Sequence, residues 1–508
     1  MERSSFIILD KLSENFQKFS GNTAFYIRGL FYTYQQFQQR ISAIQKLILS
    51  KVPDNEKYIG VLSNDHVDTY ASIFALWFTG KTFVPLSPLN PSERNQEIIR
   101  QMGLQHILSA GESLGLTSES LQLVLITNSQ TGGNSEILIV DTSSETDAYV
   151  LFTSGSTGSP KGVRISRGNL DVFYRSYITF GPEYIKDDRF LQIYDISFDG
   201  SVPCYLVALC TGASVYTVPQ DEIKYLYAIK LMKEHDLTIL KMTPSMLFYL
   251  RPFFDRIYLP NVRICLFGGE ALPVALTEEW MKCVPNALIQ NVYGPTEATV
   301  DCLIYNFNSG DFQKKSNAGV VSLGRKFGDF EYVVINPEGI PVQEDEEGEL
   351  CLHGAQVMSG YWKDEDKSSK AFIHLKTDNG IKKFYRTGDL VSRDSDGFFM
   401  YRGRIDNQVQ IQGYRVELGE IEMHSREVVG DVNLAAIAGR NRNGQEEIVL
   451  FIGGGEITQE TVMSYLQTRL PNYMIPAKVI FLDDIPRLVS GKTDYKKLSE
   501  KADFYAYN

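Results

Sequence analysis

Apolar residues recur with two different periods along the first 300 residues. They follow helical spacing over 9–19, 67–78 and 168–178. Short apolar runs typical of buried strands include KYIGVLSND (57–65) and residues 148–153. Because strands that alternate with helices form layered structures, the pattern predicts an α/β core.

The same periods predict further elements up to residue 291, and a polar surface loop over 128–136. We expect strands at 31–34, 81–88, 190–194, 213–217, 237–241, 262–267 and 287–291. We expect helices at 201–210 and 244–251.

Beyond residue 310 the pattern changes to glycine and short β-rich segments, such as GELCLHG (348–354) and GFFMYRGR (397–404). Such segments are typical of antiparallel sheet with turns, and here they indicate a β-barrel-like subdomain. The last 100 residues read as a small α+β unit. The predicted fold class is therefore α/β, with a large N-terminal domain of layered subdomains over 1–405 and a small domain over 406–508.

Composition narrows the class of protein. The 508 residues are 43% hydrophobic and 22% charged, which is typical of packed domains. The net charge of -12 disfavours a nucleic-acid partner. No apolar run approaches the ~18 residues of a membrane span, and no secretory signal is visible. Six cysteines without a CxxC pair, and six histidines without HExxH, argue against a zinc site or a disulfide framework. We expect a cytoplasmic protein with free thiols.

A glycine-rich loop, LFTSGSTGSPKGV (151–163), carries the first candidate chemistry. Its backbone N–H groups, hydroxyls and Lys161 suit anionic oxygens. The loop fits neither GxxxxGK[ST] nor GxSxG. Taken alone, it could also be a flexible surface loop.

Two other segments place carboxylates where a nucleotide site needs them. Glu297 in NVYGPTEATV (291–300) could hold Mg²⁺ beside a triphosphate. Asp389, expected at a turn in FYRTGDLV (384–391), could accept the ribose hydroxyls. Each has a structural alternative, a helix start for the first and an Asx-turn for the second.

Together these segments resemble the adenylate-forming superfamily, from about residue 31 to residue 498. Seven stretches match in the family's order: LFTSGSTGSPKGV, FDGS, NVYGPTEATV, GELCLHG, FYRTGDL, GRIDNQVQIQGYRVELGEIE and GKTDYKKL. The sixth is similar to the amino-acid-activating branch, the adenylation domains of nonribosomal peptide synthetases. The length and LPNYMIP resemble the free-standing D-alanine–carrier protein ligases.

The resemblance implies a two-step reaction with ATP and Mg²⁺. A carboxylate attacks the α-phosphorus to give an acyl-adenylate, and a thiol then takes the acyl group. Thr296 and Glu297 would lie at the α-phosphate, with Glu297 on the metal. The other implied ATP-binding residues are Thr153, Ser154, Gly155, Ser156, Thr157, Gly158, Lys161, Gly269, Glu270, Ala271, Asn291, Tyr293, Gly294, Asp389 and Arg404.

The small domain is implied to be a mobile lid that carries a catalytic lysine. Lys492 in GKTDYKKL would stabilise charge on the substrate carboxylate and the bridging oxygen, although a lysine is usually solvated at the surface. Asp406 matches the family's hinge, where backbone dihedrals change between the two steps.

Asp199 of FDGS matches the residue that pairs with the α-ammonium of an amino acid, unless it caps the helix at 201–210. The remaining implied pocket wall is Gly200, Pro203, Lys241, Leu266, Gly268, Val292, Val300 and Asp301. Lys241 needs a partner, because a buried unpaired charge is costly. Either Asp301 neutralises it, or a polar or acidic substrate such as aspartate or asparagine does, and we expect the latter.

The expected acceptor is the phosphopantetheine of a carrier protein supplied in trans, since no carrier motif follows Lys492. D-alanine or another small amino acid is the alternative substrate. A fatty- or aryl-acid CoA ligase and a nucleotide-binding regulator without catalysis are the alternative functions. The sequence leaves open the enantiomer, the pathway, the oligomeric state and whether the chain is one module of a longer synthetase.

Overall fold

The computed structural model describes most of the chain, in two compact units. The first comprises residues 1–87, 102–151 and 162–405, and the second comprises 88–101, 152–161 and 406–508. The ranges outside the described residues are 1–5, 112–120, 127–135, 156–158, 308–314, 431, 443, 455–456, 488–492 and 508, with only the backbone described for 503–507. The surface loop expected at 128–136 falls almost wholly in one of these ranges.

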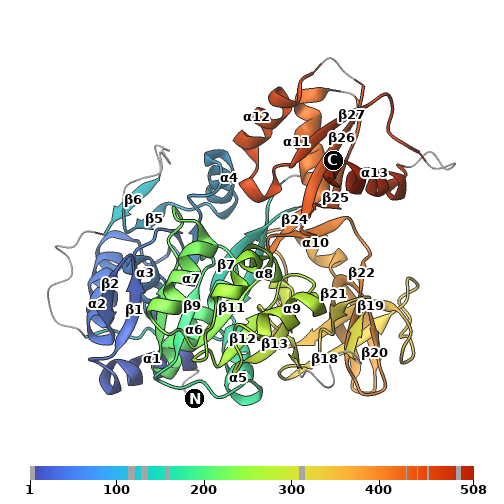
Figure 1. The fold of residues 1–508 in the computed structure, drawn as a ribbon. Coiled ribbons are helices and arrows are strands. Elements are labelled where there is room, and N and C mark those ends of the chain that lie inside the picture. The colour runs from blue at the N-terminus through green and yellow to red at the C-terminus, as the bar shows by residue number, and fades with distance from the viewer. Residues whose placement is uncertain are drawn as a thin grey trace. The chain divides into compact units, whose positions relative to one another are not determined.

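A nine-stranded sheet forms the centre of the first unit (Figure 1). Its middle strands are parallel, and antiparallel strands close both edges. The order is β17 (Arg325–Lys326), β14 (Leu303–Phe307), β13 (Leu288–Tyr293), β12 (Ile264–Phe267), β11 (Ile239–Met242), β9 (Arg189–Gln192), β10 (Ser214–Thr217), β1 (Thr23–Ile27) and β2 (Leu30–Thr33).

Helices cover both faces of this sheet because its parallel strands are apolar on both sides. Alternate residues of β11 and β12 belong to two different hydrophobic clusters. One cluster contains α5 (Arg167–Phe180) and α6 (Ser201–Thr211). The other contains residues of α7 (Lys224–Glu234), α8 (Pro244–Leu250) and α9 (Val274–Met281).

A second, six-stranded sheet shares the larger cluster. Its order is β6 (Gln122–Leu125), β5 (His106–Ser109), β3 (Tyr58–Leu62), β4 (Thr82–Leu86), β7 (Asp147–Thr153) and β8 (Lys161–Ser166). Helices α1 (Ile7–Lys18), α2 (Tyr34–Lys51) and α3 (Val67–Phe78) contribute to the same core. Helix α3 is buried along its whole length, so its apolar residues are not confined to one stripe.

The region after residue 310 is an antiparallel sheet, as its glycine-rich pattern predicts. Its strands are β18 (Phe330–Ile335), β19 (Gly348–Gly354), β21 (Gly380–Arg393), β20 (Phe372–Thr377) and β22 (Phe399–Arg404). Beside it lie the short strands β15 (Ser316–Asn317) and β16 (Val320–Val321), and helix α10 (Glu365–Lys370). The layered α/β class predicted from the sequence is confirmed.

The second unit has its own core. A hairpin of β23 (Gln408–Ile411) and β24 (Tyr414–Glu417) leads into α11 (Leu418–Val429). A three-stranded sheet of β25 (Asn433–Arg440), β26 (Glu446–Gly453) and β27 (Lys478–Leu482) packs with α12 (Gln459–Arg469) and α13 (Tyr495–Tyr507). Most of helix α4 (Ser92–Met102) also belongs to this unit.

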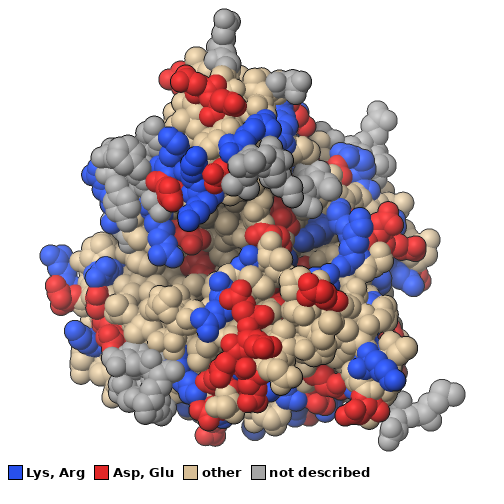
Figure 2. All heavy atoms as spheres, turned by 90° about the vertical axis from the view of Figure 1, so that its right-hand side faces the viewer, with Lys and Arg blue, Asp and Glu red and all other residues tan. Residues whose placement is uncertain are grey.

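Charged residues of both signs share the surface. Figure 2 shows one face, on which acidic and basic side chains lie intermixed.

No helix in the described part of the chain is both long and apolar enough to cross a membrane. All six cysteines are buried and free.

Candidate active site

Four of the expected pocket residues, Lys241, Leu266, Gly268 and Val292, lie on or directly after central parallel strands. Lys241 on β11 is the direct neighbour of Leu266 on β12, and Val292 lies at the end of β13. Ligands of open α/β sheets bind at the carboxyl ends of such strands. All nine expected pocket residues of the amino acid site are buried.

Lys241 has an internal partner, the carboxylate of Asp301. The two form an ion pair whose side chains are each 6% exposed. Tyr177 of α5 completes the group. Its hydroxyl donates to Oδ2 of Asp301 and accepts from Nζ of Lys241 at 3.3 Å. Of the two partners that the sequence allowed for Lys241, the structure contains Asp301.

Asp199 does not cap the helix that follows it. The N-cap of α6 is Gly200, and no side chain caps that helix. Burial raises the pKa of the Asp199 carboxyl to about 6, and a hydrogen bond from Thr296 lowers it. The Asp301 carboxylate also raises this pKa and the Lys241 ammonium lowers it, so the three charges lie close enough to interact.

A strained loop between β13 and β14 holds Val300 and Asp301. Thr299 and Val300 have φ values of 56° and 72°, which β-branched residues rarely adopt. The side-chain amide of Gln356 stabilises the loop by donating to the carbonyls of Ala298, at 2.9 Å, and Asp301, at 2.7 Å.

Gly294 faces the same loop. A Cβ at this position would lie 2.3 Å from the Val300 carbonyl oxygen, so only glycine allows the loop to approach so closely.

Glu297 is fully buried on the short helix η3 (Thr296–Ala298). Its Oε1 accepts a hydrogen bond of 2.8 Å from the hydroxyl of Tyr361, and its backbone oxygen accepts from Met358. The described residues contain no group of three or more acidic, histidine or cysteine side chains that could hold a metal alone. Glu297 could therefore contribute one carboxylate to a Mg²⁺ ion whose other ligands are phosphate oxygens and water, as is usual at nucleotide sites.

Asp389 corrects one expectation, because it lies inside β21 and not at a turn. Register shifts of β21 against β19 and β22 mark irregular pairing around it. Its carboxylate accepts from the hydroxyl of Tyr293 at 2.5 Å and from Nη1 of Arg404 at 2.6 Å. Burial and the Asp389 charge raise the pKa of Tyr293, which therefore remains a neutral donor.

The segment expected to flank the adenine follows β12. Gly269 is exposed with φ 83°, and Ala271 is exposed. The Glu270 carboxylate accepts from both the backbone N–H and the hydroxyl of Ser245, at 2.7 and 2.6 Å. Asn291 of β13 is buried and donates to the Ser322 carbonyl.

The described part of the glycine-rich loop already binds a carboxylate. The N–H of Gly155 donates to Glu420 at 3.1 Å, and Nζ of Lys161 lies 3.5 Å from Glu417, all within the second unit. The hydroxyl of Ser154 donates to the carbonyl of Arg415. Thr153 ends β7, and its Oγ1 is buried without a partner among the described residues.

Four expected residues lie outside the described part of the chain: Ser156, Thr157, Gly158 and Lys492. Asp406 begins the main segment of the second unit, directly after β22 and Ile405. Its carboxylate accepts from the N–H of Gln408 at 3.2 Å.

Sequence reasoning missed three residues that hold the site together: Tyr177, Gln356 and Tyr361. Tyr177 reads as one more apolar position of an amphipathic helix. Gln356 and Tyr361 follow β19 in an irregular segment without periodicity. Each contacts its site residue across more than 50 positions of sequence, so only the folded chain reveals the contact.

Residues 12–362, more than two thirds of the chain, match the family described as AMP-binding enzyme. The chain belongs to this family.

It is 29% identical over 478 residues to tyrocidine synthase 1 of Brevibacillus parabrevis. The aligned region covers 92% of this chain and 42% of that protein. It is also 29% identical to zwittermicin A synthase ZmaJ of Bacillus cereus, covering 92% of this chain and 90% of ZmaJ. The chain thus spans less than half of the first relative and nearly all of the second.

The fold agrees with solved structures of adenylation domains. The Vibrio cholerae adenylation domain AlmE, solved with glycyl-adenosine-5'-phosphate, has a TM-score of 0.84 over 98% of both chains at 24% identity. At this identity the likeness establishes the fold alone. The chain is thus a member of the AMP-binding enzyme family, and its fold is that of solved adenylation domains.

Proposed function

We propose that the chain activates an α-amino acid with ATP and then transfers the aminoacyl group to the phosphopantetheine thiol of a carrier protein. Asp199 carries this proposal. It is a buried carboxylate next to the strand-end pocket, and its side chain caps no helix. An α-ammonium would give this carboxylate the opposite charge that a buried ion requires.

In the first step the substrate carboxylate attacks the α-phosphorus, a new O–P bond forms, and pyrophosphate leaves with the electrons of the broken P–O bond. The chain needs no covalent nucleophile for this displacement, so it acts by positioning and by stabilising charge. Thr296 would donate to the α-phosphate, and Lys492 would stabilise the charge that develops between the carboxylate and the phosphate.

In the second step the carrier thiol attacks the carbonyl of the aminoacyl-adenylate. A C–S bond forms, AMP leaves with the electrons of the C–O bond, and the thiol proton passes to solvent. Asp406 would be the hinge at which the small domain moves between the two steps.

Magnesium would be held by Glu297 together with phosphate oxygens and water, and it would neutralise charge on the triphosphate. The Tyr361 hydroxyl already fixes the orientation of the Glu297 carboxylate. The ribose would bind at Asp389, which Tyr293 and Arg404 hold in place. Gly155, with the neighbouring loop, would bind the phosphates, and its bond to the Glu420 carboxylate indicates that its N–H suits an anionic oxygen.

The proposal also concerns which amino acid side chain the enzyme accepts. The sequence favours a polar or acidic residue such as aspartate or asparagine, through Lys241, and this stays a prediction. The ion pair of Lys241 with Asp301 counts against a carboxylate side chain.

Amino-acid-dependent ATP–pyrophosphate exchange tests the function. We expect exchange with at least one amino acid and about a 100-fold loss of kcat/KM for that amino acid in Asp199→Asn, since a bond to a charged group contributes about 1.5–3 kcal/mol. The exposed Asp187→Asn is the matched control and should behave as wild type. Exchange with a simple carboxylic acid alone, unchanged in Asp199→Asn, would contradict the proposal and favour a CoA ligase. Transfer is then measured as labelled aminoacyl group on a phosphopantetheinylated carrier.

A further inference from the structure

Three ionisable side chains from three separate elements meet beside the expected amino acid pocket. Lys241 belongs to β11, Asp301 to the loop before β14, and Tyr177 to α5. As whole residues, Lys241, Asp301 and Tyr177 are 5%, 4% and 2% exposed. Water therefore screens the charges weakly, and their partners determine which ligands the site accepts.

The three groups form a closed triangle of hydrogen bonds. Lys241 donates to Asp301 and to Tyr177, and Tyr177 donates to Asp301. Burial and the Asp301 charge raise the pKa of Tyr177, so its hydroxyl keeps the proton that it donates. The triangle thus contains one positive and one negative charge, and it is neutral as a whole.

Independent contacts fix each corner of the triangle. The side-chain amide of Gln356 donates to the backbone carbonyl of Asp301 and thereby holds this residue in the strained loop. Tyr177 packs against Phe327, with ring centroids 5.2 Å apart, and Lys241 is fixed by the parallel pairing of β11. The ion pair therefore exists without any help from a substrate side chain.

We propose that Tyr177, Asp301 and Lys241 act as one charge-neutral unit at the wall of the side-chain pocket, with Tyr177 as its positioning residue, so that the enzyme selects amino acids whose side chain carries no charge. This inference rests on the proposed function, and it narrows the expected polar or acidic side chain, such as that of aspartate or asparagine, to an uncharged one.

The selection follows from what each class of side chain would do to the triangle. A substrate carboxylate would compete with Asp301 for Lys241 and leave one anion without a partner. A substrate ammonium would compete with Lys241 for Asp301 in the same way. Breaking a buried pair strands a charge, which is far more costly than leaving the pair intact beside a neutral side chain.

The experiment measures ATP–pyrophosphate exchange with three groups of amino acids: uncharged ones (glycine, alanine, serine), acidic ones (aspartate, glutamate) and basic ones (diaminopropionate, ornithine). We expect the wild type to prefer an uncharged amino acid. In Asp301→Asn the lone Lys241 charge should raise the ratio of acidic to uncharged kcat/KM at least about 100-fold. In Lys241→Met the ratio of basic to uncharged kcat/KM should rise in the same manner.

Tyr177→Phe removes only the hydroxyl. We expect the acidic-to-uncharged ratio to rise about threefold to tenfold, because Asp301 is held less firmly against Lys241. Tyr184→Phe is the matched control. Tyr184 stacks on Tyr177, and its hydroxyl is buried without a partner among the described residues. The ratio should not change in this variant, which separates positioning from general packing.

The double variant Lys241→Met/Asp301→Leu is a control for misfolding of the single variants. It removes both charges of the pair, so no unpaired charge remains buried. It should keep the preference for uncharged side chains. The inference is overturned if the wild type prefers an acidic amino acid, or if Asp301→Asn leaves the preference unchanged. Absence of exchange with every amino acid would instead overturn the proposed function itself.

Discussion

Asp199 shows how one buried side chain can link the chemistry of a site to pH. Burial raises the pKa of its carboxyl to about 6, and the nearby carboxylates of Asp301 and Glu297 act in the same direction. The Thr296 hydroxyl and the Lys241 ammonium oppose them. The charged form that an α-ammonium requires is therefore not fully populated just below neutral pH.

We predict that kcat/KM for the amino acid in the exchange reaction falls about tenfold for each pH unit below about 6 and is flat between pH 7 and 8. The sign follows from the raised pKa, because protonation of Asp199 removes the negative charge that binds the ammonium. Measurements from pH 5 to 8 on wild type and Asp199→Asn test this. The acid limb should vanish in the variant, and an identical limb in both proteins would show that another group titrates.

At the scale of elements, the site depends on a strained loop between two strands, β13 and β14. Left-handed backbone at Thr299 and Val300 costs on the order of 1–3 kcal/mol per residue and persists only when the surroundings hold it. The buried side chain of Gln356 supplies that hold from a segment 55 residues away. The loop that holds Val300 and Asp301 is thus fixed by a side chain from another segment of the chain.

Replacing that amide tests the arrangement. We predict that Gln356→Leu lowers kcat/KM for the amino acid at least about tenfold, because misplacement of a site residue by about 1 Å can cost 100-fold. The KM for ATP should change less than twofold. Gln17→Leu, on the exposed face of α1, is the control and should leave both values unchanged. An equal effect on both substrates would indicate general unfolding and contradict a local role.

The elements best predicted from the sequence are those whose burial follows a simple pattern. The helix expected at 67–78 is α3, residue for residue. Helix α4 was missed, because its sequence SERNQEIIRQM has no broad apolar stripe. Arg94 of this helix is buried and forms an ion pair with Glu420. Hydrophobic periodicity cannot predict a buried position that is occupied by a charged residue.

The candidate site was predictable to a similar degree. The family resemblance identified single residues, such as Asp199 in the turn before α6 and Lys241 on β11, because each matching position is local in sequence. They left the partner of Lys241 open, since Asp301 lies 60 residues away and Tyr177 lies 64 residues away. Pairing across such separations depends on how sheets and helices pack.

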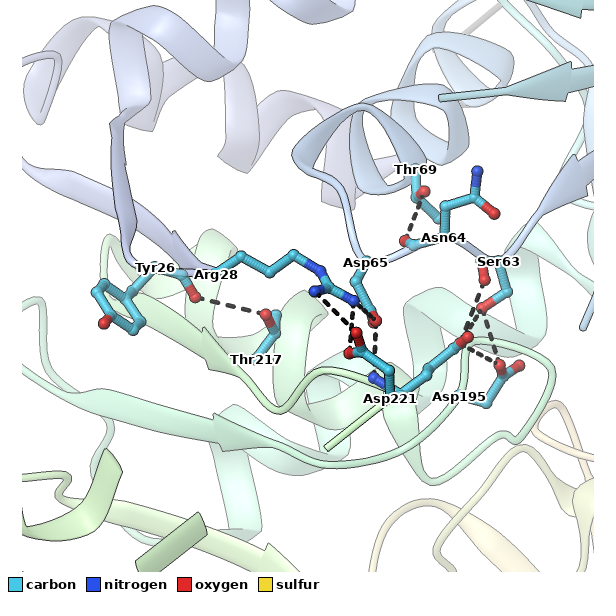
Figure 3. Close-up of polar contacts among 10 residues, drawn as sticks. Tyr26, Arg28, Ser63, Asn64, Asp65, Thr69, Asp195, Thr217 and Asp221 are labelled. Carbon is cyan, nitrogen blue, oxygen red and sulfur yellow. Dashed lines mark hydrogen bonds and ion pairs between the residues drawn. The ribbon is translucent and has the colours of Figure 1, made fainter. Parts of the chain in front are cut away.

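At the scale of the whole molecule, a buried carboxylate joins the two large sheets of the first unit (Figure 3). Asp195, which follows β9, accepts hydrogen bonds from the hydroxyls of Ser63 and Ser87, at 2.9 and 3.0 Å, where β3 and β4 end. It also accepts from the Gln220 side chain at 2.7 Å, beyond β10. Strands of the nine-stranded and six-stranded sheets are therefore connected through one side chain.

The rim of this network is exposed. Arg28, in the turn between β1 and β2, forms ion pairs with Asp65 and Asp221, and the Asp221 side chain is 67% exposed. Figure 3 labels Asp195 and Ser63 of the buried part, and Arg28, Asp65 and Asp221 of the exposed part. The network thus offers a direct comparison of one carboxylate inside the protein with another at its surface.

We predict that Asp195→Ala lowers the free energy of unfolding of the first unit by about 2–4 kcal/mol, because it leaves buried donors of two sheets without their charged acceptor. Asp221→Ala removes an exposed ion pair and should cost less than about 1 kcal/mol. Urea unfolding of the full chain, followed by tryptophan fluorescence, measures both, since all three tryptophans (Trp77, Trp280 and Trp362) belong to the first unit. Equal losses in the two variants would contradict a role for Asp195 in joining the sheets. A larger loss in Asp195→Ala, with an unchanged slope against urea, would mean that the two sheets unfold together and that this carboxylate is part of the reason.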